Sequence, residues 1–193
     1  MTRFIMLGLI LIGVAACSEA GTSTTAGASP VTSGAASEPA AGQPSNGESG
    51  SGRCHTGELK VAAQAAPGGG AAGNVYTWLV FANASARACT LYGYPGVSWV
   101  TGADGQQVNQ PAERDPSGKP AMVTLQPGGT AHAQVHAGHP DMFPDTCKPV
   151  PVAGYRVYPP DETEALFVPV ADKQCSADGV NRAVVEPITT AGS

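Results

Sequence analysis

The side chains best suited to bind a metal ion lie close together in the second half of the chain. They are His132, His136, His139, Asp141 and Met142. Imidazole and thioether groups suit copper. If residues 130–136 form a strand, His132 and His136 share its polar face about 13 Å apart, too far for one ion. His136, His139 and Met142 remain as a candidate copper site in the following loop, and the alternative is a solvated strand face followed by a loop.

No motif for nucleophilic catalysis or nucleotide binding is complete in this sequence. The segment Gly96-Val97-Ser98-Trp99-Val100 lacks the last glycine of the GxSxG motif. Residues 68–73 match GxGxxG, but a strand-like sequence follows where a phosphate-binding helix would have to begin. We therefore expect a flexible loop there, and we predict that the protein is not an enzyme and holds no cofactor.

The amino terminus resembles a bacterial lipoprotein export signal. Arg3 precedes an apolar run over residues 4–14, and the segment Val14-Ala15-Ala16-Cys17 resembles a lipobox. As a helix the run covers about 16 Å, too short for a hydrocarbon core of about 30 Å. Residues 1–16 are thus predicted to be a cleaved signal peptide and Cys17 a lipidated anchor on the outer face of the cell membrane. The alternative is an ordinary signal peptide with an incidental cysteine.

A low-complexity segment separates this signal from the rest of the chain. Residues 18–52 are almost entirely small or polar, with Val31 the only larger aliphatic residue and no aromatic one. Such a composition cannot bury enough surface to offset the entropy lost on folding. We predict a disordered linker over 17–53, one folded domain over 54–188 and a disordered tail over 189–193.

The predicted domain alternates short apolar runs with turns rich in proline and glycine. The predicted strands are 59–65, 75–82, 97–100, 122–125, 130–136, 155–158, 165–170 and 183–188. Hairpin turns are predicted at 103–105, 126–129 and 159–162. No segment has sustained helical periodicity, so the fold class is all-β, an immunoglobulin-like antiparallel β-sandwich.

Four cysteines remain once the anchor is set aside: Cys54, Cys89, Cys147 and Cys175. An even number in an exported domain predicts two disulfides, with three possible pairings. We favour Cys54–Cys89 and Cys147–Cys175, because each would join neighbouring segments of the chain. The absence of a CxxC spacing argues against a redox-active pair and a zinc ribbon.

Several sequence strings resemble one family of actinobacterial lipoproteins, the domain of unknown function DUF4232. They are 79–85 (LVFANAS), 89–97 (CTLYGYPGV), 125–129 (LQPGG), 147–149 (CKP) and 157–160 (VYPP). The resemblance covers essentially residues 54–188. It implies a secreted or lipidated β-sandwich behind a low-complexity tether, and it implies no catalytic residues.

The few aromatic residues divide into two groups. Those in predicted strands are expected in the core: Trp78, Phe81, Trp99, Tyr155 and Phe167. Tyr92 and Tyr94 flank a turn, where we expect a corner tyrosine bonded to the backbone. The alternative is a recognition patch for a glycan or a peptide, since tyrosine offers rigid amphipathic contact area.

The net charge of −5 argues against nucleic acid as a partner, because no basic surface is available to phosphates. We therefore expect a non-catalytic binding or cell-envelope interaction module, whose partner is an envelope protein, a glycan or a small ligand. The alternative is an extracytoplasmic copper-binding module that uses His136, His139 and Met142.

Overall fold

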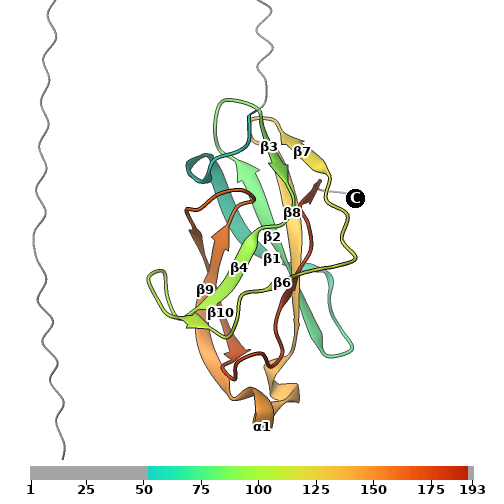
Figure 1. Cartoon of the computed structure of the whole chain (residues 1–193), viewed down its shortest axis with the longest axis vertical. Coiled ribbons are helices and arrows are strands. Elements are labelled where there is room, and N and C mark those ends of the chain that lie inside the picture. The colour runs from blue at the N-terminus through green and yellow to red at the C-terminus, as the bar shows by residue number, and fades with distance from the viewer. Residues whose placement is uncertain (1–51, 191–193) are drawn as a thin grey trace, which may run out of the picture. The chain divides into compact units, whose positions relative to one another are not determined.

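The computed structural model describes residues 52–190, which form a β-sandwich with very little helix (Figure 1). The predictions for the signal peptide, for Cys17 and for nearly all of the linker lie outside the described residues. Over 52–190, no helix is long and apolar enough to cross a membrane.

The described residues contain twelve strands and three short helical segments. The strands are β1 (Leu59–Ala71), β2 (Asn74–Asn83), β3 (Cys89–Tyr92), β4 (Gly96–Val100), β5 (Gln107–Val108), β6 (Glu113–Arg114), β7 (Met122–Leu125), β8 (Thr130–Gly138), β9 (Pro149–Tyr158), β10 (Leu166–Cys175), β11 (Val184–Val185) and β12 (Thr189–Thr190). The helical segments are η1 (Thr56–Glu58), η2 (Pro140–Met142) and α1 (Pro144–Cys147).

The strands form two main sheets and one small one. The first has the order β1-β2-β8-β11-β6, with β12 also paired to β8, and the second has the order β10-β9-β4-β5. Strands β3 and β7 form a separate pair at the end of the sandwich where the described chain begins (Figure 1). Every strand pair is antiparallel except β11 with β6. The predicted antiparallel β-sandwich is confirmed.

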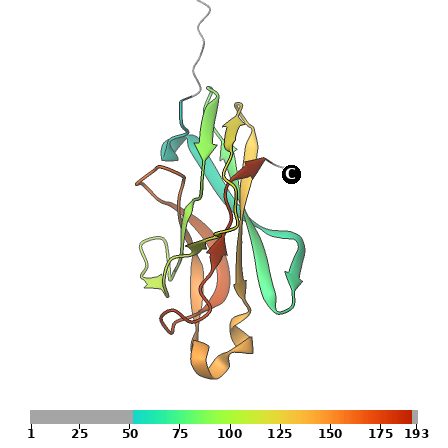
Figure 2. The ribbon, with the colours of Figure 1, turned by 45° about the vertical axis from the view of Figure 1, so that its right-hand side comes forward.

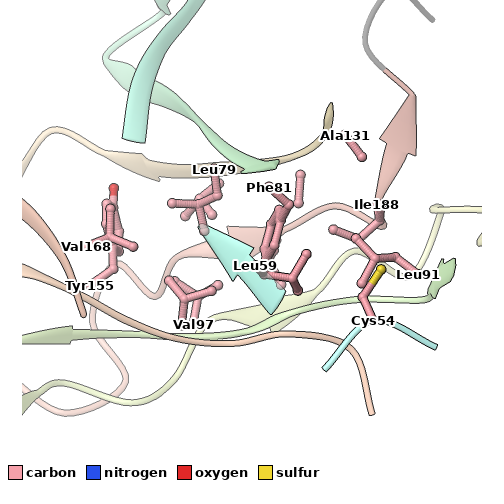
Figure 3. Packing of buried hydrophobic residues seen from close by; sticks show 14 of the residues in the cluster. Cys54, Leu59, Leu79, Phe81, Leu91, Val97, Ala131, Tyr155, Val168 and Ile188 are labelled. Atoms are coloured by element: carbon pink, nitrogen blue, oxygen red, sulfur yellow. The ribbon is translucent and has the colours of Figure 1, made fainter. Parts of the chain in front are cut away.

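The core lies between the two main sheets. Strand β2 is central, paired with β1 on one side and β8 on the other, and its alternate residues Leu79 and Phe81 are fully buried. They belong to one cluster with Val97 and Tyr155 from the opposite sheet (Figure 3). Period-2 alternation of buried and half-buried residues along β2 is what a strand at the face of a sandwich requires.

Both predicted disulfides are present. Cys54–Cys89 joins the segment before η1 to the start of β3, and Cys147–Cys175 joins α1 to the end of β10. All four cysteines are fully buried.

The predicted hairpin at residues 126–129 is wrong. The turn over 126–129 forms, since Gly129 N donates to Gln126 O at 2.8 Å, but it does not make a hairpin. Strand β7 pairs with β3, and β8 pairs with β2. The turn therefore connects strands of two different sheets. The residues of the turn do not determine which strands pair with one another.

The glycine-rich segment is also different from the predicted flexible loop. Strand β1 continues through it to Ala71, with a shift of register between Ala65 and Gly70. Gly68 and Gly73 adopt φ values of 81° and 80°, which glycine tolerates without strain. Figure 2 shows this hairpin at the side of the sandwich, with its tip toward the same end as α1.

The domain is wider than the predicted range of 54–188. Arg53 forms a bridge with Thr90 of β3. At the other end Thr189 and Thr190, predicted to begin the disordered tail, form β12 and pair with β8. Short polar strands of this kind have no hydrophobic alternation to mark them in the sequence.

Candidate functional site

The two histidines of β8 point to its outer face, as the strand periodicity predicts, and each packs on an aromatic ring of β2. The His132 ring stacks on Trp78 with centroids 4.2 Å apart, and the His136 ring stacks on Tyr76 at 5.2 Å. His132 is buried and its Nε2 lies 3.2 Å from Thr189 Oγ1. The imidazoles are therefore held in place by packing.

The remaining candidate copper ligands have other neighbours. His139 Nδ1 accepts a hydrogen bond from Asp141 N at 3.4 Å at the start of η2. The sulfur of Met142 lies against Gly73 at the tip of the β1–β2 hairpin. Between residues 52 and 190, no group of three or more His, Cys, Asp or Glu side chains gathers as a metal ion requires. The copper hypothesis gains no geometric support.

Tyr94 has the corner role predicted for one of the two turn tyrosines. Its hydroxyl donates to the carbonyl of Asp115 at 2.9 Å, which ties the segment after β3 to the segment after β6. The Arg114 guanidinium lies 5.7 Å from the centroid of the Tyr94 ring, within the range of a cation–π contact. Both side chains are therefore held in fixed positions.

Tyr92, in contrast, is exposed. It is the last residue of β3, and its partner across the strand pair is Met122 of β7. Tyr92 is 49% exposed and Met122 63% exposed, so the two side chains present apolar surface to solvent. Gly93 follows with φ of 95°, a value that favours glycine, and turns the chain between the two tyrosines.

A groove of about 240 Å³ lies beside Tyr92. Its lining residues, which we call the tyrosine groove, are Tyr92, Gly93, Tyr94, Arg114, Pro120, Pro160 and Asp161. Arg114 and Asp161 belong to no salt bridge within the described part of the chain. The tyrosine groove thus combines exposed aromatic surface with one guanidinium and one carboxylate that are not committed to each other.

One wall of the tyrosine groove is fixed by Glu162, the residue after Asp161. Its carboxylate accepts hydrogen bonds from Thr56 N at 3.0 Å, from Thr56 Oγ1 at 3.1 Å and from Arg53 Nε at 3.0 Å. His55 Nδ1 lies 3.1 Å from the same carboxylate. The pKa of Glu162 is lowered to about 2, chiefly by the backbone N–H of Thr56. The turn between β9 and β10 is therefore anchored to η1.

The second feature next to the groove is an open strand edge. Strand β7 pairs with β3 and with no other strand of the described residues. An unpaired edge leaves backbone N–H and C=O groups free to bind an extended segment. Met122 begins this strand and pairs with Tyr92, so β7 starts next to a lining residue of the tyrosine groove.

Only part of the tyrosine groove and its surroundings could be predicted from the sequence. Tyr92 and Tyr94 were singled out, whereas Met122, Arg114 and Asp161 were not, because they come from separate short segments that only the fold brings together. An exposed residue within a short strand carries no sequence signal of its own.

The predicted core aromatics are confirmed for Phe81, Trp99 and Tyr155, which are all buried. The prediction is wrong for Phe167, which is 36% exposed, and for Trp78, which is half-buried on the outer face of β2. A strand that is apolar on both faces can be covered by a second layer on one face only, and the sequence does not say which.

Asn83 heads an Asn-Ala-Ser sequon, but its side chain is buried. The amide nitrogen donates to the carbonyls of Arg87 at 2.8 Å and Leu125 at 3.1 Å. The side-chain oxygen accepts from Ser85 N at 3.0 Å. All polar atoms of the amide are engaged in the fold, so this asparagine is a structural residue.

Comparison with known proteins gives one match. The sequence model of a family described as a domain of unknown function (DUF4232) matches residues 54–189. No curated protein and no solved structure matches the chain at a significant level.

Proposed function

The chain belongs to the DUF4232 family, and from this premise we propose that it is a non-catalytic binding module held at the outer face of the cell membrane by a lipid on Cys17. The partner we propose is an extended segment of a cell-envelope protein. The observation that carries this proposal is the tyrosine groove and the open edge of β7 beside it.

The side chains of the groove suit a protein ligand. Tyrosine and arginine are the residue types that most often dominate binding energy at protein interfaces, because they offer large contact areas at low entropic cost. Tyr92 is exposed, and Arg114 is oriented by the ring of Tyr94. A carboxylate on the partner would complete the hydrogen bonds of the guanidinium.

The backbone beside the groove supports an extended ligand. A segment added to the edge of β7 would continue the β3–β7 pair by main-chain hydrogen bonds, and its side chains would alternate between the two faces of that pair, one of which carries Met122 and Tyr92. Main-chain bonds of this type supply affinity, and the Tyr92 and Arg114 contacts would supply specificity.

The test is site-specific photo-crosslinking on intact cells. A benzophenone amino acid replaces Met122 in one variant and Lys173 of β10 in the other, two exposed positions. We expect a discrete light-dependent adduct from position 122 that is lost when Tyr92→Ala and Arg114→Ala are added. Equal adducts from both positions, or none from position 122, would contradict the proposal.

The anchor has its own test. Cys17→Ser removes the sulfur that takes the lipid, and Ser18→Ala is the matched control. We expect the wild type and the control to incorporate labelled palmitate and to partition into detergent, and the Cys17 variant to lose both. Retention of detergent partitioning by Cys17→Ser would mean that the lipid is absent or attached elsewhere.

Two alternative functions, copper binding and catalysis by a serine nucleophile, can each be measured directly. Calorimetric titration with Cu(I) and Cu(II) is expected to give no heat, because the ring of His136 is stacked on Tyr76 and no three His, Cys, Asp or Glu side chains gather as metal ligands between residues 52 and 190. Labelling with a serine-directed fluorophosphonate is expected to fail. Stoichiometric copper binding would favour the copper-binding module, and covalent labelling would favour an enzyme.

A further inference from the structure

A second surface, independent of the tyrosine groove, lies on the outer face of the first sheet. Along β2 the residues Leu79 and Phe81 point into the core, so Tyr76, Trp78 and Val80 point outward. All three are half-buried, although nothing in the described chain forms a further layer over this face (Figures 1 and 2). Part of the Trp78 side chain is therefore accessible to a ligand.

The indole of Trp78 is held rigidly. His132 stacks on it at 4.2 Å with 24° between the ring planes, and His132 is fixed in turn by Thr189 at 3.2 Å. Burial lowers the pKa of His132, which keeps the imidazole neutral at neutral pH. A ring that is already ordered loses little entropy when a ligand packs on it.

Beside the indole is a hollow of about 300 Å³ that we call the tryptophan hollow. Its lining residues are Gln64, Trp78, Val80, Thr130, Ala131 and His132. The volume is at the lower end of the range typical of small-molecule sites, about 300–1,000 Å³. The lining contains no carboxylate, ammonium or guanidinium group, so nothing in it favours a charged ligand.

The sheet itself limits what can bind here. Strand β2 is paired on both sides, with β1 and with β8, so its backbone cannot accept another strand. A ligand on this face is recognised by side chains alone. Those side chains offer the indole ring of Trp78, one exposed amide from Gln64 and one hydroxyl from Thr130. Val80, Ala131 and the stacked imidazole of His132 complete the lining.

We propose that the tryptophan hollow binds an uncharged sugar ring, with the C–H face of the ring against Trp78 and its hydroxyl groups toward Gln64 and Thr130. A pyranose has one apolar face surrounded by hydroxyl groups, which matches an indole next to an amide and a hydroxyl. The electron-rich face of the indole attracts polarised C–H groups, and the amide of Gln64 both donates and accepts hydrogen bonds.

The test is affinity electrophoresis of the full-length protein in native gels that contain a soluble neutral polysaccharide: an α-glucan, a β-glucan, a mannan or a galactan. We expect at least one polymer to retard the wild type. Trp78→Ala should weaken the retardation by at least about tenfold, as the loss of a central aromatic contact does. Gln64→Ala, a change at an exposed side chain, should weaken it less.

Two variants serve as matched controls. Tyr92→Ala removes an exposed aromatic residue from the tyrosine groove, and Phe167→Ala removes one from β10 of the second sheet. Both should retain full retardation. The result is separate from the test of the proposed function, because Tyr92→Ala and Arg114→Ala together are expected to abolish crosslinking, whereas Tyr92→Ala should leave sugar binding intact.

Competition with the free monosaccharide distinguishes a polymer ligand from a free sugar. The monosaccharide is added at the concentration of sugar units that the polymer supplies in the gel. Complete loss of retardation indicates that the natural ligand is a free sugar, and weak loss indicates that it is a polymer. The proposal is overturned if none of the four polymers retards the wild type. It is equally overturned if Trp78→Ala and Gln64→Ala, each with an unchanged melting temperature, migrate as the wild type does.

Discussion

The carboxylate of Glu162, in the turn between β9 and β10, accepts hydrogen bonds from both the backbone N–H and the hydroxyl of Thr56 in η1. The two residues are separated by 106 positions in the sequence. The contact closes the domain between its first turn and a hairpin late in the chain. It also holds Asp161 and Pro160 in the wall of the tyrosine groove.

Glu162→Gln is expected to lower the free energy of unfolding by about 1–2 kcal/mol at neutral pH. The side chain of Glu162 is 10% exposed, and the amide would turn donor N–H groups toward donors on Thr56 and Arg53. Urea unfolding followed by tryptophan fluorescence measures the change. Glu164→Gln is the control, because its side chain is exposed. An equal effect of the two substitutions would contradict the assignment.

The same carboxylate makes stability depend on pH. Its pKa is about 2 in the folded protein against an ordinary value of 4.5, so folding favours the ionised form. The stabilisation is complete above about pH 5 and is lost as the pH falls from about 4.5 toward 2. Melting temperatures measured across this range should fall less steeply for Glu162→Gln than for the wild type.

A residual acid slope should remain in Glu162→Gln. The pKa of Glu58 is lowered by its hydrogen bond from Arg87, and the pKa of Asp115 is lowered by its hydrogen bond from Ser117. Identical profiles for the wild type and the variant would show that Glu162 does not contribute.

The disulfides should contribute strongly to stability. Cys147 and Cys175 are 28 positions apart, and the chain-entropy account gives about 3.5 kcal/mol for closing a loop of this length. The double variant Cys147→Ser/Cys175→Ser should lose about this much stability in urea unfolding under oxidising conditions. Non-reducing peptide mapping of the wild type should recover Cys54 linked to Cys89 and Cys147 linked to Cys175. Free thiols at these positions would contradict both statements.

Gly154 of β9 should not tolerate a side chain. A Cβ at this position would overlap the backbone carbonyl of Val168 on the neighbouring strand and would lie 2.9 Å from a ring carbon of Phe167. Gly154→Ala is expected to destabilise the domain by about 2–3 kcal/mol, because backbone cannot move aside as a side chain can. Gly57→Ala is the control, since no atom lies within 4 Å of its Cβ position. Thermal unfolding should separate the two variants clearly.

Asn83→Ala should be one of the more damaging single substitutions. The amide bonds carbonyls of Arg87 and Leu125, and its loss leaves the buried carbonyl of Leu125 without that donor. We expect a loss of about 2–3 kcal/mol in the free energy of unfolding. Ala84→Ser, next to it on an exposed position, should be neutral. Equal melting temperatures for Asn83→Ala and the wild type would contradict the structural role.

The sequence predicts the positions of the strands better than it predicts which strands pair with one another. The strands around Leu79, Val97 and Val157 follow from short runs of apolar, β-branched and aromatic residues between turns, and each forms where it is predicted. The turn at Gln126 was also found, but not the sheets that it connects. Pairing is decided by contacts between distant segments, and a single sequence contains no direct record of them.

The candidate surfaces illustrate the same limit. The turn marked by Pro95 and Gly96 predicts a corner tyrosine at Tyr92 or Tyr94, and the bond of Tyr94 to Asp115 shows which of the two it is. Trp78 was assigned to the core, because β-branched and aromatic neighbours on both faces suggest complete burial. Only the structure reveals that no segment among residues 52–190 forms a layer over its face of the sheet.

The bridge between Cys54 and Cys89 decides how the domain would carry a mechanical load. A pull on the chain before Cys54 passes through the covalent sulfur bond directly to the start of β3. A ligand held at Tyr92 would sit at the far end of that same short strand. In the anchored protein that we propose, tension between the cell surface and a bound partner would therefore bypass β1 and β2, and the large sheet would not be pulled apart from its first strand.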